Sequence, residues 1–257
     1  MGVFQINKEF QKEIKIGTCG WGGKKSKYYE TFSCIELQET FYKLPKIETL
    51  EKYRLESPKN FEFIIKAWQV ITHPYNSPTW KKSTPPKWGK IENFGYLKPT
   101  EENFKAWEEI IKICKILKSK IIIIQTPPSF NPSKDNIENM KKFFSSINRE
   151  DLILGWEPRG DWNSDIIANI CKELNLIHVV DPFRRLPSIE SNIIYFRLHG
   201  IGGKETNYRY VYTNEDLNKL YNIIMKINAE IFYVMFNNIK MIEDAIKFMK
   251  IINLKLQ

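Results

Sequence analysis

The chain has 257 residues, of which 42% are hydrophobic and 14% are aromatic. This composition supports a large globular core and excludes a disordered chain. Lys and Arg exceed Asp and Glu by 39 − 30 = 9, an excess that attracts anionic partners, including nucleic acid, and that also serves solubility.

Two classes of location are disfavoured. No apolar run approaches the ~18 residues that a membrane span needs, and the opening residues, MGVFQINK, lack the basic and then apolar pattern of a secretory signal. The four cysteines, at positions 19, 34, 114 and 171, form no CxxC pair, which disfavours a disulfide framework or a zinc ribbon. We therefore expect a cytoplasmic protein without membrane contact.

Short apolar runs alternate with helical patterns along the whole chain. Such alternation predicts a parallel sheet, and eight strands predict closure into a barrel. We therefore predict an α/β fold, a single (β/α)8 TIM-type barrel domain over 1–257. An open doubly wound sheet is the alternative, but no G-x-G-x-x-G follows the first strand. The expected strands are 14–19, 33–38, 61–66, 120–125, 152–157, 177–181, 193–199 and 231–237, and the expected helices are 45–55, 101–117, 133–144, 163–174, 213–227 and 238–252.

One segment, 68–100, interrupts this rhythm after the third strand. It contains five prolines and six Trp, Tyr or Phe residues. A loop of this length inside a domain is usually a lid or a binding element, and its aromatic rings could stack on a sugar or a base. The alternative is a small satellite core that holds the loop in place.

Polar residues appear in phase at the ends of the strands. In 34–38, Glu36 and Gln38 share one strand face, and in 193–199 Tyr195, Arg197 and His199 do the same. In a parallel barrel such polar ends meet at the mouth, where barrel enzymes keep their chemistry. The same alternation gives the other mouth candidates: Lys66, Gln125, Glu157, Arg159, Asp181, Asn237 and Asn238, with His73 in the loop.

These groups have a structural alternative to catalysis. Buried charges must pair, bind a ligand or change their protonation. The acids could therefore pair with the Lys and Arg residues in a salt-bridge network that fills the barrel.

Ordered motifs along the chain resemble one protein family. GTCGW at 17–21 is similar to the opening G-T-S-G-W motif of the domain of unknown function 72 (YecE-like) family, with Cys19 in place of the usual serine. Gln38 and Glu39 replace a usual asparagine and serine. The resemblance implies a TIM-type barrel and no settled reaction. It continues through Glu36 and TFYKLP at 40–45, FEF at 61–63, Lys66, ITH at 71–73, QTPPSF at 125–130, EPR at 157–159, Trp162, RLHG at 197–200 and FNN at 236–238.

The leading hypothesis is a hydrolase or lyase that acts on an anionic substrate, such as a phosphate ester or a phosphorylated sugar. Arg159 and Arg197 would grip the anion, because guanidinium offers paired donors, and Lys66 would stabilise charge in the transition state. Glu36 and Glu157 would be the acid and base, with His199 or His73 relaying a proton. The remaining substrate-binding candidates are Gln38, Gln125, Asp181, Asn237 and Asn238.

Three alternatives stay open. No cofactor is expected, but a divalent metal could be held by Glu36, Glu157, Asp181 and His199, although Lys66 and Arg197 would compete with it for the carboxylates. A nucleic-acid-binding protein without catalysis would use the positive charge and the aromatic loop. A metabolite-binding barrel without turnover is the third alternative.

Overall fold

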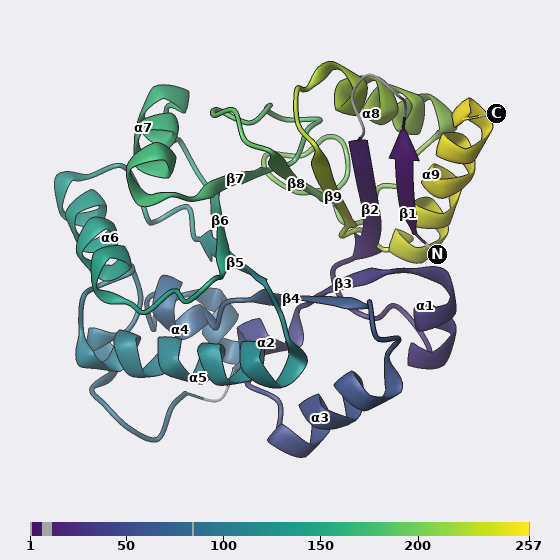
Figure 1. Ribbon diagram of the computed structural model, residues 1–257. Helices are drawn as coiled ribbons and strands as arrows, with labels where there is room; N and C mark the ends of the chain where they lie inside the picture. Colours follow the sequence, from purple (N-terminus) through teal and green to yellow (C-terminus); the bar gives the residue numbers. More distant parts are fainter. Residues whose placement is uncertain (1, 7–11, 84, 257) are drawn as a thin grey trace. The chain divides into compact units, whose positions relative to one another are not determined.

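The computed structural model describes residues 2–6, 12–83 and 85–256. Within these residues, each parallel strand but the first is reached through a helix or a loop, in the order expected of a TIM-type barrel (Figure 1). The predicted α/β class is therefore confirmed. The contacts divide the chain into two compact units. The first unit is Met1–Glu36, Pro58–Glu62 and Ile177–Gln257, and the second is Leu37–Ser57 and Phe63–Leu176.

All eight predicted strands are present, with ends that move by one or two residues. They are β2 Lys12–Thr18, β3 Cys34–Leu37, β4 Glu62–Lys66, β5 Ile121–Thr126, β6 Ile153–Pro158, β7 Ile177–Val180, β8 Ile193–Leu198 and β9 Ile231–Phe236. In the first unit, β2 pairs in parallel with β9, β9 with β8, and β8 with β7. In the second unit, β4 pairs in parallel with β5, and β5 with β6.

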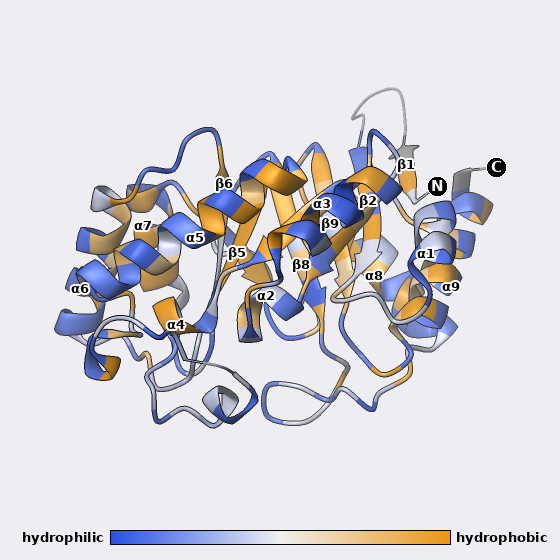
Figure 2. Cartoon of the chain, turned by 90° about the horizontal axis from the view of Figure 1, so that it is seen from below, coloured by the Kyte–Doolittle hydropathy of each residue, from blue (hydrophilic) through white to orange (hydrophobic). Residues whose placement is uncertain are grey.

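The six predicted helices are also present. They are α3 Ile47–Glu56, α5 Glu101–Leu117, α6 Lys134–Ser146, α7 Ser164–Leu174, α8 Asn214–Lys226 and α9 Met241–Leu256. The side chain of Ser133 accepts a hydrogen bond from Asn136 N, so the expected cap of α6 forms. The strands are mostly orange in Figure 2, while the helices alternate between orange and blue, as expected of strands in a core and of amphipathic helices.

Four short elements were not expected from the sequence: β1 Val3–Ile6, α1 Lys25–Thr31, α2 Glu39–Tyr42 and α4 Gln69–Thr72. β1 pairs antiparallel with β2. The two four-residue helices are too short to show a helical period, so the sequence carries no signal for them. No helix in the described part of the chain has both the length and the apolar character required to span a bilayer.

The aromatic segment 68–100 contains α4 and two short 3-10 helices, η1 Pro78–Lys82 and η2 Ile91–Asn93. Trp80 and Phe94 are buried in it, and the ring of Trp88 lies 5.6 Å from that of Phe94 and 6.5 Å from that of Trp68. These rings form a small satellite core that holds the segment in place, which is the second of the two roles that the sequence suggests for it. Tyr75, in contrast, is 53% exposed. The role of the 68–100 segment as a lid stays a prediction.

Candidate functional site

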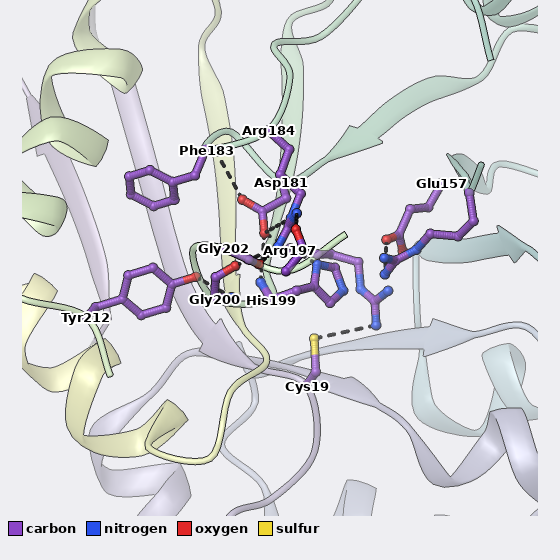
Figure 3. A network of polar contacts seen from close by, with 12 residues as sticks. Cys19, Glu157, Asp181, Phe183, Arg184, Arg197, His199, Gly200, Gly202 and Tyr212 are labelled. Carbon is purple, nitrogen blue, oxygen red and sulfur yellow. Dashed lines mark hydrogen bonds and ion pairs between the residues drawn. The ribbon is translucent and has the colours of Figure 1, made fainter. Parts of the chain in front are cut away.

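In the first unit, Glu36 and Arg197 form an ion pair whose side chains have no exposed surface. Arg197 Nε donates to Glu36 Oε2 at 3.0 Å, and Nη2 donates to Oε1 at 2.8 Å. This bidentate geometry fixes both planar groups. Arg197 Nη2 also lies 3.8 Å from the sulfur of Cys19 (Figure 3), and Cys19 forms a parallel bridge with Glu36.

Two stacked tyrosines connect this ion pair to a second carboxylate, that of Glu62. Tyr195, two residues before Arg197 and on the same strand face, donates its hydroxyl hydrogen to Glu36 Oε2 at 2.9 Å. Its ring stacks on that of Tyr233 at 5.6 Å, and Tyr233 donates to Glu62 Oε2 at 2.6 Å. Burial, and then the Glu36 carboxylate, raise the pKa of Tyr195, so its hydroxyl stays protonated and donates.

A second group in the first unit joins Asp181 and His199, which both follow strand ends. Asp181 Oδ2 accepts from His199 N at 2.9 Å and lies 3.6 Å from His199 Nδ1. Asp181 Oδ1 accepts from Phe183 N at 3.1 Å. Both side chains are buried. The Asp181 carboxylate is thus hydrogen-bonded to the backbone of His199 and lies beside its imidazole.

Arg184 connects this group to the glycine-rich loop after β8 (Figure 3). Its Nη2 donates to the carbonyl oxygens of Gly200 at 2.9 Å and Gly202 at 2.7 Å, and Nε lies 3.7 Å from Asp181 Oδ2. Gly200 has a φ of 85°, and a Cβ atom there would lie 2.1 Å from Asn207 O. Only glycine therefore fits this turn.

The two asparagines after β9 differ in their surroundings. Asn238 is buried, and its Nδ2 donates to Tyr210 O and to Asp244 Oδ2, both at 2.8 Å. These bonds hold the chain between β9 and α9. Asn237 is half-buried, and its backbone N–H donates to Leu198 O at 2.9 Å. The substrate-binding role suggested for both residues stays a prediction.

In the second unit, Lys66 at the end of β4 is a buried cation, 5% exposed. Its Nζ lies 3.3 Å from Gln38 Oε1 and 4.1 Å from the centre of the Phe41 ring. The ring face and the amide oxygen both stabilise the ammonium group. Gln38 comes directly after β3, so the two predicted site residues do lie together.

Glu157 and Arg159 form the second buried ion pair, again within the second unit. Arg159 Nη2 lies 2.6 Å from Glu157 Oε1, and both side chains are almost fully buried. Gln125 is the register partner of Glu157 in the β5–β6 pair, and Lys66 is the partner of Ile123. Register partners of parallel strands share a sheet face, so Lys66, Gln125 and Glu157 point to one side.

His73, directly after α4, is buried and neutral. Its Nδ1 lies 2.8 Å from Thr72 Oγ1, and its ring packs edge-on against that of Phe41 at 5.1 Å. Burial, and then the charges of Lys66 and Arg159, lower the pKa of His73 to about 3. Burial and the two cations thus all favour the neutral imidazole.

The structure thus brings the predicted residues together in smaller groups. In the first unit these are Glu36 with Arg197, and Asp181 with His199; in the second unit, Lys66 with Gln38, and Glu157 with Arg159 and Gln125. The two buried ion pairs are of the kind expected of a salt-bridge network. Among the described residues, no three His, Cys, Asp or Glu side chains are arranged to hold a metal ion, and both oxygens of Glu36 accept from Arg197. The metal set of Glu36, Glu157, Asp181 and His199 stays a prediction.

The sequence placed Tyr195 on the strand face of Arg197 but gave it no role. Sequence reasoning missed Arg184, because it lies in a loop, where no period reveals which way a side chain points.

Polar groups at the carboxyl ends of parallel strands, with helices between the strands, define this chain as a TIM-type barrel protein. The chain belongs to the family described as "Protein of unknown function DUF72", whose model matches residues 16–257. The resemblance seen in the motifs is therefore confirmed.

Relatives support this assignment. UPF0759 protein YunF of Bacillus subtilis (strain 168) is 26% identical in an alignment of 144 positions that covers 50% of this chain and 45% of YunF. The chain therefore matches less than half of the length of this relative. A DUF72 family protein of Enterococcus faecalis V583 has a TM-score of 0.70 at 20% identity, with 93% of this chain and 97% of that chain covered. One from Thermotoga maritima MSB8 has a TM-score of 0.68 at 22% identity, with 95% and 99% covered. At these identities the two structures show the fold alone.

Proposed function

We propose that this protein is an enzyme, a hydrolase or lyase, that acts on an anionic substrate such as a phosphate ester or a phosphorylated sugar. The observation that carries the proposal is the presence of two buried cations in the second unit. Lys66 and Arg159 are buried there, and both disfavour a proton on His73. Cations held away from water attract an anion more strongly than surface lysines do.

The residues of the second unit would divide the work. The Lys66 ammonium group and the Arg159 guanidinium group bind the anion and stabilise charge that develops on its oxygens. Glu157, held at Oε1 by Arg159, transfers the proton as general acid or base. Gln125 lies beside it on the same sheet face and orients the substrate. Glu36 and His199 in the first unit remain candidates for the same proton-transfer chemistry.

The anion site is tested by calorimetric titration with inorganic phosphate and with a simple phosphate ester. Lys66→Met keeps the apolar stem of the side chain and removes its charge, so binding should weaken by about tenfold or more. Lys112→Met is the matched control, because the Lys112 side chain is 64% exposed and pairs with Glu109 on the surface. Equal affinity in wild type and Lys66→Met would refute the anion site.

Catalysis is tested separately with Glu157→Gln. This change keeps the shape of the side chain and removes its ability to exchange a proton. We expect turnover of phosphate esters or glycosides, screened with and without divalent ions, to be abolished while circular dichroism stays unchanged. Full activity in the variant would remove Glu157 from the mechanism.

The net charge of +9 favours nucleic acid as a second candidate partner. Binding to a nucleic-acid backbone weakens steeply as salt rises, whereas binding of a small anion in a buried site responds less. Fluorescence anisotropy with a labelled oligonucleotide at two salt concentrations separates the two. The absence of binding at low salt would exclude this candidate.

A further inference from the structure

The short helix α4 contains polar side-chain groups that have no partner among the described residues. Gln69 is completely buried, and neither its Oε1 nor its Nε2 has a hydrogen-bond partner there. The indole N–H of the preceding residue, Trp68, is buried and also has none. An amide without partners inside a protein costs about 1–3 kcal/mol per group, so such groups normally meet a ligand or a bound water.

The backbone around Gln69 is, in contrast, fully engaged. The N–H groups of 95–97 donate to the carbonyl oxygens of 70–72 at 2.7–3.0 Å, and His73 N donates to Gln69 O at 2.7 Å. These main-chain bonds join the loop to α4. The Gln69 side chain takes no part in them, and a structural role for its amide is therefore not visible.

Gln69 and His73 lie one helical turn apart. Gln69 is the first residue of α4 and His73 is the residue directly after it, and His73 N donates to Gln69 O at 2.7 Å. His73 is the residue on which Lys66 and Arg159 act electrostatically. The unpartnered amide is therefore close in the chain to a ring that packs against Phe41, and Lys66 Nζ lies over that same Phe41 ring.

Thr72 links the two residues. Its hydroxyl lies 2.8 Å from His73 Nδ1, where the donor depends on the imidazole tautomer, and 3.5 Å from Gln69 O. Burial, and then the charges of Lys66 and Arg159, keep the ring neutral, so one ring nitrogen has a hydrogen and the other is an acceptor.

We propose that Gln69 and His73, at the two ends of α4, bind hydroxyl groups, so that the substrate is a hydroxylated phosphate ester of the sugar-phosphate class. A hydroxyl group both donates and accepts, which matches an amide whose donor and acceptor have no partner among the described residues and a neutral imidazole with one donor and one acceptor. This inference rests on the anion-binding function proposed above and adds the recognition of the rest of the substrate.

The test compares three probes by calorimetry: inorganic phosphate, methyl phosphate and ribose 5-phosphate. The wild-type protein should bind ribose 5-phosphate more tightly than methyl phosphate. Gln69→Met, which keeps the volume and removes the amide, should bind ribose 5-phosphate about tenfold more weakly. Its affinity for methyl phosphate and for inorganic phosphate should not change. Lys112→Met, with the same new side chain at an exposed position of α5, should behave as wild type.

The melting temperature of Gln69→Met gives a second readout. Because no protein hydrogen bond is lost, this variant should melt at or above the wild-type temperature. Equal affinities for the two esters, or a lower melting temperature without any change in the affinity ratio, would overturn the hydroxyl site and leave the anion site intact. If none of the three probes binds, the proposed function itself fails, and this inference with it.

Discussion

Arg197 meets Glu36 with two parallel hydrogen bonds, of 3.0 and 2.8 Å, and neither side chain has any exposed surface. Their positions are 161 residues apart in the chain, and Tyr195 supplies a third bond to the same carboxylate. Such a pair orients both groups firmly. If one member is altered, the other is left as a buried charge without compensation.

Glu36→Gln should therefore lower the free energy of unfolding by about 3–5 kcal/mol, because Arg197 keeps its charge and loses its counter-ion. Urea unfolding followed by tryptophan fluorescence measures this loss. Glu138→Gln is the matched control, since it breaks an exposed pair with Lys142 on α6 and should cost less than about 1 kcal/mol. Similar losses in the two variants would contradict the importance of the buried pair.

His73 should make stability depend on pH. Its pKa is about 3 in the folded chain against an ordinary value of 6.5, because of burial and of Lys66 and Arg159. As the pH falls through 6.5, the unfolded chain takes up a proton and the folded chain does not. The contribution of the neutral His73 to the free energy of unfolding is thus complete above pH 6.5 and is lost as the pH falls toward 3.

The slope between about pH 4 and pH 6 should approach 1.4 kcal/mol per pH unit for this one group. Urea unfolding of the wild type and of His73→Phe at several pH values isolates the contribution of His73. The other titrating groups cancel when the unfolding free energies of the two proteins are subtracted. Parallel curves for the two proteins would show that His73 takes up its proton in the folded chain as well.

The satellite core of the 68–100 segment should contribute to stability. Trp80 is 7% exposed, donates its indole N–H to His73 O at 3.1 Å and packs near Phe94. Trp80→Ala should therefore cost about 3–5 kcal/mol. Tyr75→Ala, at an exposed position of the same segment, should change the unfolding free energy by less than about 0.5 kcal/mol. Equal effects in differential scanning calorimetry would mean that the segment does not pack as a core.

Arg184 should hold the glycine-rich loop after β8. Arg184→Met removes the bonds to the carbonyl oxygens of Gly200 and Gly202, so we expect faster amide hydrogen exchange in 200–206 and little change elsewhere. Mass spectrometry of the exchanged peptides measures this. The region of α6, far from Arg184 in the chain and in the other unit, serves as the internal control. Unchanged exchange in 200–206 would show that the glycine turns hold the loop without Arg184.

The eight parallel strands and the six long helices were predictable from the sequence because their patterns are repetitive. Runs such as IIYFRL at 193–198 display the two-residue period of a strand, and 101–117 displays the helical period. The same period predicted that Glu36, Lys66, Glu157 and Arg197 would lie at strand ends. The short helices α2 and α4 were not predictable from the sequence, because four residues are too few to display a helical period.

The tertiary structure alone decided which carboxylate pairs with which Lys or Arg side chain. The sequence offered several acids and several cations, and nothing in it distinguished Arg197 from Lys66 as the partner of Glu36. Strand register and the reach of each side chain made that choice. The tertiary structure alone also shows that the Gln69 amide is buried without a hydrogen-bond partner among the described residues. Burial depends on residues that are distant in the chain, whereas a sequence pattern describes only neighbours along the chain.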